Sequence, residues 1–469
     1  MNKLKNILKK IRHKFFVILF WSVVSAAFIG PGTVTTLTKA GVYYHFDLMW
    51  TILFSIFACL LLQEASARIT IYSGMNLGEA IAKQFAGKKS RGAVIFSVIM
   101  AIVLGSAAYE AGNILGSIEG LHFIFPHTDK LWFVTIVALL AIIALNLKSI
   151  RIIAQFLGAF VFLMGFAFLF TAIVVKPDID ALLLGSFIPT IPDVPGAGIL
   201  ILGIIGTTVV PYDIFLGSGI IDKTHNIRDV RFGLSVAIIL GGIISMSIMT
   251  VGSALTAGWS EEALKNLTFS FDIIKDALYL NSYINEYAVY IFGIGMFAAG
   301  FTSAITAPLA SAITTRSLLN QQNNEKWGSQ SLRFRLLTIT ILAVGLTFGF
   351  LQVKPVPAII LAQAFNGLIL PFISIFLMIV INNPEIMGKK RINSHFSNIL
   401  MSFVVWITTV IGILNIYKAI ERAIKFKSPN SDTVFWIISI LAFLITIYVV
   451  VKIYKFRKEK LVILQQQND

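Results

Sequence analysis

The stretch AAFIGPGTVTTLTKAG, at residues 26–41, places a glycine–proline–glycine triplet in the middle of a long apolar run. A second stretch, GIIGTTVVPYDIFLGSG at residues 203–219, places a glycine and a proline at similar depth in another run. Proline removes a backbone donor and clashes with the preceding helical turn, and glycine lowers the cost of non-helical angles. The two stretches therefore predict two helices broken near their centres. The breaking residues are Gly30, Pro31 and Gly32 in the first and Gly206 and Pro211 in the second.

The composition indicates an all-α integral membrane protein. Of 469 residues, 57% are hydrophobic and 13% are charged, whereas soluble domains have roughly 45–50% and about 25%. This difference excludes a soluble globular domain. The one cysteine, Cys59, excludes a disulfide scaffold and a multi-cysteine metal site.

Apolar runs long enough to cross a bilayer recur along the whole chain. A helix needs about 20 residues to span roughly 30 Å of hydrocarbon, and we expect about twelve such spans in one membrane domain covering 1–469. The expected spans are 16–43, 46–71, 92–121, 131–147, 153–175, 196–218, 232–257, 287–315, 333–353, 356–381, 397–417 and 433–454.

The net charge of +15 is dispersed over short loops between the spans. Basic loops lie on the cytoplasmic side of membrane proteins, and alternation from the basic N-terminus places both termini inside the cell. One basic loop, 417–430, falls on the outer side and dissents from this pattern. We therefore expect a multi-pass protein of the cell membrane with cytoplasmic termini. Dispersed charge also excludes a nucleic-acid partner.

The two broken spans occupy corresponding places in two five-helix halves. Each break alone is typical of a proline kink, but a matched pair of interrupted spans is a pointer to the substrate site of an inverted-repeat transporter. We expect a first repeat at 16–175, a second repeat at 196–381 and two additional helices at 397–454. A membrane enzyme would need paired acids or a nucleophile motif, which the spans lack. A receptor or scaffold would have no need of the breaks.

Motifs in six spans resemble the NRAMP family of proton-coupled divalent metal transporters, which have a LeuT-like fold. The first broken stretch is similar to that family's DPGN-centred helix, and GTTVVPYD is similar to its sixth helix. The resemblance implies a secondary transporter that works by alternating access and is not an enzyme. The remaining matches are LLQEASARITIYSGMNLGEA at 61–80, AGNILGSIEGL at 111–121, AAGFTSAITAP at 298–308 and LAQAFNGLILPF at 361–372.

The positions that bind metal in the family carry other residues here. Where the family has the DPGN aspartate this chain has Gly30, and where it has the sixth-helix methionine this chain has Val210. A tenth-helix glutamine is kept as Gln363. The remaining replacements are Thr33 for asparagine, Thr207 for alanine, Tyr212 for histidine, Asp213 for asparagine and Asn113 for the third-helix acid.

The altered first helix favours a small anion. Manganese and iron sites need negatively charged oxygen ligands, and a thioether favours transition metals; neither stands at the matched positions. Free amides after Gly30 and Gly32, together with hydroxyls such as Thr33, Thr207 and Thr208, suit an anion at a helix N-terminus. Bicarbonate is a substrate of this kind. Lys39 either adds positive potential to the site or extends to the outer interface of the membrane.

Asp213 supports the alternative of a divalent cation. If its carboxylate faces the cavity, it replaces the missing aspartate and holds a hard ion such as magnesium or manganese. If it points toward the cytoplasmic vestibule or pairs with a lysine or arginine, it has no such role; pairing is usual for intramembrane acids. Both interpretations of the substrate stay open from the sequence.

Ion coupling is expected to involve buried polar groups near the site. Glu110, Asn113 and Lys39 are the candidates, and the coupling ion of a symport cycle is H⁺ or Na⁺. We expect no organic cofactor and no obligate protein partner; the small inorganic ion and the lipid bilayer are the expected partners. Glu64 and Arg68, four residues apart in the second span, are expected to form a structural ion pair.

Overall fold

Long apolar runs without internal breakers fold as helices. Among the residues that the computed structural model describes, the regular secondary structure is helical. The described residues are 29–146, 165–192, 196–221, 224–271, 285–319, 327–328, 330–423 and 431–466, with Val17, Ala159 and Leu163. Within them, nine helices are long and apolar enough to cross a membrane. The expected all-α membrane architecture is confirmed.

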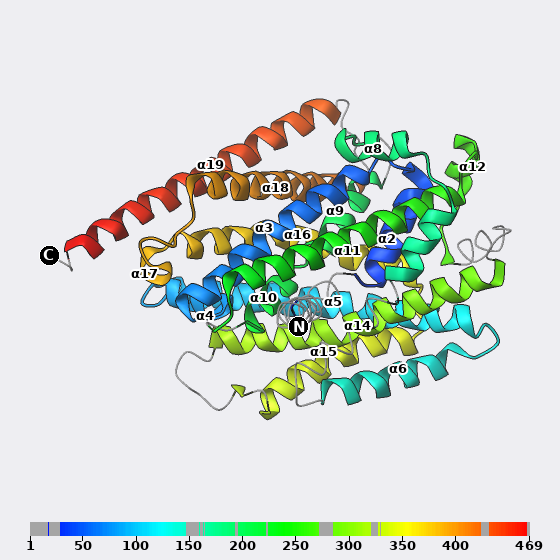
Figure 1. Ribbon diagram of the computed structural model, residues 1–469, viewed down its shortest axis with the longest axis horizontal. Helices are drawn as coiled ribbons and strands as arrows, with labels where there is room; N and C mark the ends of the chain where they lie inside the picture. The colour runs from blue at the N-terminus through cyan, green and yellow to red at the C-terminus, as the bar shows by residue number, and fades with distance from the viewer. Residues whose placement is uncertain are drawn as a thin grey trace, which may run out of the picture.

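The long helices form a bundle whose axes run along one direction (Figure 1). Eight of the nine correspond to expected spans 2, 3 and 7–12, and the ninth, residues 197–219, corresponds to span 6; the shorter helix α6 corresponds to span 4. The first part of expected span 5, and the part of span 1 before Ile29, lie outside the described residues apart from Val17, Ala159 and Leu163; the rest of span 5 includes an apolar helix at Gly165–Val174. The bounds are α3 (Met49–Ser73), α5 (Arg91–Ile124), α6 (Lys130–Leu145), α11 (Ile227–Leu255), α14 (Asn285–Leu319), α15 (Leu332–Phe350), α16 (Pro355–Ile381), α18 (His395–Ala423) and α19 (Ser431–Gln466).

The second expected break lies within the described residues, whereas of the first the structure describes the residues from Ile29 onward. Helix α2 (Pro31–Tyr44) begins directly after Gly30, with proline at its first position. The sixth span divides into α9 (Ala197–Thr208) and α10 (Pro211–Gly219), with extended backbone at Val210. Proline is favoured at a helix start because its missing N–H is not needed there. Each break is thus set by a proline that starts a new half-helix.

Gly206 corrects one expectation, because it lies inside α9 and takes no part in the break. A Cβ placed on Gly206 would lie 2.2 Å from the Gln363 carbonyl oxygen and 2.5 Å from the Gly367 nitrogen. This glycine therefore permits close packing of α9 on α16 rather than an unwound segment. Small residues at helix interfaces let backbones approach in this way.

The same packing joins α5 and α14. A Cβ on Gly300 would lie 2.2 Å from Ser117 Oγ, and a Cβ on Gly120 would lie 2.3 Å from the Phe297 nitrogen. The small-residue stretch 298–308 is therefore a packing surface along much of its length. Side chains on the outside of the bundle are apolar instead, as lipid contact requires; examples are Leu104, Ile136, Ile339 and Leu444.

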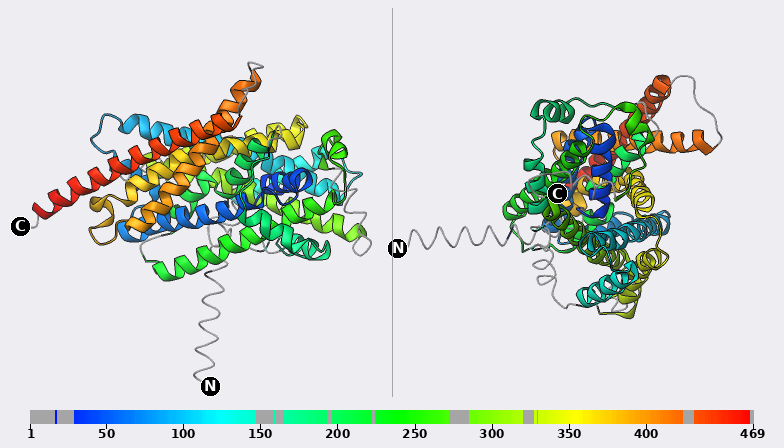
Figure 2. Two further views of the ribbon diagram at one scale, coloured as in Figure 1. Left: turned by 90° about the horizontal axis from the view of Figure 1, so that it is seen from above. Right: turned by 90° about the vertical axis from the view of Figure 1, so that its right-hand side faces the viewer.

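Short helices cover the two ends of the bundle. Helices α4 (Leu77–Gln84) and α17 (Pro384–Met387) lie at the end toward which α19 points, whereas α8 (Ile179–Phe187) and α12 (Glu261–Asn266) lie at the opposite end (Figure 1). Figure 2 shows α19 running along the outside and extending past the other helices. This helix continues to Gln466, beyond the expected span end at 454.

Candidate functional site

The two helix breaks meet inside the bundle. The Thr33 and Thr207 hydroxyl oxygens are 2.7 Å apart, although 174 positions separate them in the chain. Both residues are fully buried. The start of α2 and the end of α9 therefore form one polar centre, as the pairing of broken spans predicts.

The backbone at this centre carries partial charges of both signs. Neither α2 nor α10 has a side chain that caps its N-terminus. The first N–H groups of a helix lack intrahelical partners and carry partial positive charge, and the last carbonyls carry partial negative charge. The centre can thus bind a cation through the α9 carbonyls or an anion through the two N-termini.

Tyr109 of α5 closes the centre on one side. Its hydroxyl lies 3.4 Å from Thr207 Oγ1, and its ring packs edge-on against Tyr212 with centroids 5.5 Å apart. The structure brings Tyr212 to the centre as expected. The sequence analysis does not identify Tyr109. The one signal that could have pointed to it is its position directly before the acid Glu110.

Gln363 of α16 closes the centre on another side. A Cβ placed on Gly32 would lie 1.8 Å from Gln363 Nε2, so the amide occupies the space that any side chain at position 32 would need. The Gln363 amide is buried, and neither its nitrogen nor its oxygen has a hydrogen-bond partner among the described residues. The amide lies beside the Tyr109 hydroxyl and is a candidate ligand group between the breaks.

Asp213 lies in the first turn of α10 and is 1% exposed. The Gln63 amide nitrogen donates a hydrogen bond to its Oδ2 at 3.0 Å. Its Oδ1 is buried without a hydrogen-bond partner, and the described residues give it no lysine or arginine. The described residues thus give no support to the alternative in which Asp213 pairs with a lysine or arginine. Gln63 was missed from the sequence.

Glu110 and Asn113 form a second polar pair, outside the centre. Asn113 Nδ2 donates a hydrogen bond to Glu110 Oε2 at 3.1 Å, and Glu110 Oε1 has no partner among the described residues. Asn113 Oδ1 lies 3.5 Å from where a Cβ on Gly30 would stand, whereas Glu110 lies against Gly345 of α15. Asn113 thus lies between the centre and Glu110.

The space beside Gly30 is occupied by α14. A Cβ on Gly30 would lie 2.7 Å from Ser303 Oγ. An aspartate at this position, as the resembled family has, would therefore need the Ser303 side chain to move. Ser303 belongs to the packing stretch 298–308, so the sequence gave no reason to place it beside the break.

The remaining candidates lie around the centre. The Thr208 hydroxyl donates within its own helix to the Ile204 carbonyl at 3.0 Å, and Val210 is the buried residue before α10. Lys39 lies two turns along α2 from the break, with its Nζ 5.7 Å from the centre of the Tyr43 ring.

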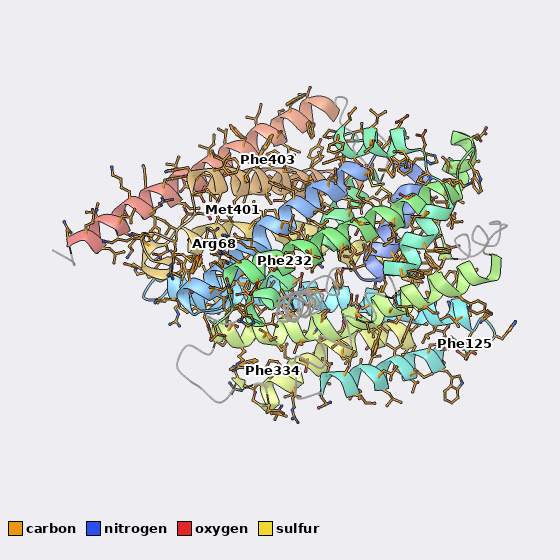
Figure 3. The ribbon with its side chains drawn as sticks, in the orientation of Figure 1. Arg68, Phe125, Phe232, Phe334, Met401 and Phe403 are labelled. Atoms are coloured by element: carbon orange, nitrogen blue, oxygen red, sulfur yellow. The ribbon has the colours of Figure 1, made fainter. Side chains whose placement is uncertain are left out.

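The expected ion pair between Glu64 and Arg68 in α3 is present, and a third residue, Arg231, joins it. Arg68 lies 3.3 Å from Glu64 Oε2, and Arg231 of α11 lies 2.7 Å from Glu64 Oε1. The group lies toward the end of α3 that is nearest α4, away from the helix breaks (Figure 3). It is a structural connection between α3 and α11.

No group of three or more histidine, cysteine, aspartate or glutamate side chains that could hold a metal ion occurs among the described residues. Hydroxyl, amide and carbonyl oxygens would therefore supply most of the ligands of a cation at the centre. Such oxygen donors suit hard ions.

An apolar helix bundle with two broken helices that meet at a buried polar centre defines a membrane transporter with a LeuT-like fold. The Natural resistance-associated macrophage protein-like (Nramp) family pattern matches residues 22–420. The chain belongs to the Nramp family, and the expected family and transporter class are confirmed; the protein is not an enzyme.

The relatives agree with this assignment over most of the chain. The chain is 24% identical to the divalent metal cation transporter MntH of Staphylococcus saprophyticus, over 85% of this chain and 90% of the relative. It is 26% identical to the MntH of Levilactobacillus brevis, over 84% and 87%. The structure of the Eremococcus coleocola manganese transporter superposes with a TM-score of 0.69 at 19% identity, covering 96% of both chains.

Proposed function

We propose that this chain transports a divalent metal cation across the cell membrane by alternating access, with Asp213 as the charged ligand. The observation that carries the proposal is the buried Asp213 carboxylate, whose Oδ1 lacks a partner among the described residues. A buried charge is stable when it is paired or coordinates a metal. The relatives whose names specify divalent metal cations support the same choice.

The donor set favours magnesium or manganese over softer metals. Beside Asp213, the residues around the centre offer the Thr33 and Thr207 hydroxyls, the Gln363 amide oxygen and the carbonyls at the end of α9. Oxygen ligands select hard ions, whereas thioether and imidazole ligands select softer ones. Val210 stands where the family has its sulfur ligand, so sulfur selection is lost.

Bicarbonate transport, which the missing first-helix carboxylate favours from the sequence alone, has no support among the relatives. Their names support the cation alternative better. The physical difficulty for an anion is Asp213: a buried negative charge close to the centre repels a second one. The two substrates make opposite predictions for variants of this residue.

Access to the centre would alternate as the helices around the two breaks move. Helix α10 is bonded to α3, since Ser66 Oγ donates to the Ile214 carbonyl at 2.9 Å and the Thr70 and Ser218 hydroxyls are 2.8 Å apart. Helix α2 packs instead against α11, where a Cβ on Gly252 would lie 2.4 Å from the Thr38 carbonyl oxygen. The two half-helices thus pack on different long helices, α3 and α11, which the Glu64–Arg231 ion pair joins to each other.

Several finer assignments belong to the same proposal. The repeats would be 16–175 and 196–381, with the two further helices at 397–454 and both termini in the cytoplasm. Glu110 and Asn113 would take part in coupling to H⁺ or Na⁺. No partner beyond the ion and the bilayer is proposed.

Equilibrium binding to the purified full-length protein tests the proposal. Isothermal titration calorimetry with Mn²⁺, Mg²⁺ and bicarbonate should show binding of at least one metal. The heat of metal binding should be absent in an Asp213→Asn variant and present in Asp178→Asn, a control at an exposed position. Binding of bicarbonate with no heat from either metal would overturn the proposal.

A further inference from the structure

A cavity of about 360 Å³ opens at the end of the bundle that carries α4, α17 and the C-terminal part of α19. Tyr72 at the end of α3, Ile386 and Met387 of α17, and the loop 388–391 line it. The cavity is remote from the helix breaks, and the proposed transport cycle makes no use of it. Its lining combines an apolar floor with three consecutive basic residues.

The loop turns into the cavity at Gly388, whose φ of 78° is in the left-handed region. The next three residues are Lys389, Lys390 and Arg391. The Arg391 guanidinium lies over the Tyr72 ring, 4.5 Å from its centre. Stacking of this kind fixes the plane of the guanidinium while leaving its N–H groups available to a phosphate.

These cations are not neutralised by a carboxylate among the described residues. Lys389 donates to the Leu464 carbonyl of α19 at 3.0 Å, which is a neutral partner. The nearest acid along the chain, Glu385, is paired with Lys460 at 2.8 Å. The cavity therefore keeps most of a triple positive charge.

An apolar path leads from this end along the outside of the bundle. Helix α18 begins four residues after Arg391 and carries Phe396, Ile399 and Phe403, which are 69%, 65% and 44% exposed. Spacings of three and four place them on one face. Figure 3 shows Phe403 on α18 toward the middle of the bundle. A ligand bound in the cavity could thus extend hydrocarbon chains along this face.

We propose that the cavity binds the phosphate headgroup of an anionic phospholipid of the cytoplasmic leaflet. Basic pockets beside membrane helices on the cytoplasmic side recognise such headgroups. The inference rests on the orientation proposed above, which places this basic end in the cytoplasm, and it is independent of the transported ion. Lys389, Lys390 and Arg391 would contact the phosphate, and Tyr72, Ile386 and Met387 would contact the glycerol region.

Native mass spectrometry of the full-length protein in detergent tests the proposal by titration with phosphatidylglycerol and, separately, phosphatidylcholine. We expect one phosphatidylglycerol to bind at least tenfold more tightly than phosphatidylcholine. Each basic residue near an anionic surface contributes about fivefold to affinity. The triple variant Lys389→Gln/Lys390→Gln/Arg391→Gln should therefore abolish the preference, and the single variant Lys390→Gln should weaken it about fivefold.

The matched control removes three exposed cations of α19 at the same end, in Lys452→Gln/Lys455→Gln/Lys458→Gln. It should keep the preference. Equal loss in both triple variants would show diffuse surface charge and overturn the proposal, as would equal binding of the two lipids by the unaltered protein. Displacement of bound lipid by excess inorganic phosphate would show a soluble-phosphate site instead. If the triple variant fails to fold, Lys390→Gln decides, because unchanged lipid preference in it contradicts the proposal.

Discussion

Replacing Asp213 by asparagine separates the two roles that its buried carboxylate could have. The substitution keeps the shape of the side chain, and an asparagine oxygen can still accept the 3.0 Å hydrogen bond from Gln63. What is lost is the negative charge. A metal ligand would lose affinity, whereas an idle buried charge would be a source of instability that the substitution removes.

The structure sets the expected magnitudes. Two unit charges 4 Å apart attract by about 4 kcal/mol at an effective dielectric constant near 20, and each tenfold in affinity corresponds to about 1.4 kcal/mol. Loss of the charge should thus weaken binding of a divalent ion by at least about a hundredfold. A buried charge without a counter-charge is costly, and the substitution removes it, so the metal-free variant should be more stable than the parent.

The assay combines titration of Mn²⁺ and Mg²⁺ with thermal unfolding of the metal-free protein in detergent. Glu110→Gln is the matched control, because Glu110 is equally buried, accepts one amide hydrogen bond and has one oxygen without a partner among the described residues. Both variants should unfold at a higher temperature, and only Asp213→Asn should lose metal binding. Unchanged metal affinity in Asp213→Asn would refute the argument.

Three further predictions concern the packing around the first break, the contact between α5 and α14, and the coupling ion. Gly30→Asp combined with Ser303→Ala should strengthen Mn²⁺ binding at least tenfold in titrations. The gain in affinity should be larger than in Gly30→Asp alone, because Ser303 Oγ lies 2.7 Å from the new Cβ. Unchanged Mn²⁺ affinity would place the site elsewhere. Gly300→Ala should destabilise the protein by about 1–3 kcal/mol through overpacking, seen as a lower unfolding temperature. Glu110→Gln should remove the dependence of uptake on an imposed pH gradient if H⁺ is the coupling ion, and retained dependence would assign coupling to another group.

Much of the fold could be predicted because a bilayer restricts what a chain can do. Apolar runs must form helices there, and the prolines at 31 and 211 each start a new half-helix inside such a run. Pro308 and Pro371, by contrast, lie inside the continuous helices α14 and α16. Gly206 was misassigned because a glycine that permits unwinding and a glycine that permits close packing look the same in a sequence. The neighbour that decides, Gln363, is 157 positions away in the chain.

The length of α19 shows a second limit. The charged residues after position 451 end the apolar run, so the membrane span was placed to end at 454. The helix continues to Gln466 because no glycine or proline interrupts it and Lys, Glu, Arg, Leu and Gln are good helix formers. Polarity predicts where the membrane ends, whereas breakers predict where a helix ends.

The candidate site was only partly predictable. Thr33 and Thr207 could be paired because the two breaks had to meet. Tyr109, Gln63 and Ser303 could not be assigned, since each contributes through tertiary contacts from a helix with no break of its own. The environment of Asp213, which decides between its roles, depends on those contacts.

Uptake into proteoliposomes is the most direct test of the central claim that this chain carries a divalent metal cation. The purified protein would be assayed with Mn²⁺, Mg²⁺ and bicarbonate under an imposed pH gradient and then a sodium gradient, beside the Asp213→Asn variant. Saturable flux of one of the metals that is absent in the variant, with no flux of bicarbonate, is the predicted result. Saturable bicarbonate flux with no metal flux would contradict the account and assign the helix N-termini to an anion.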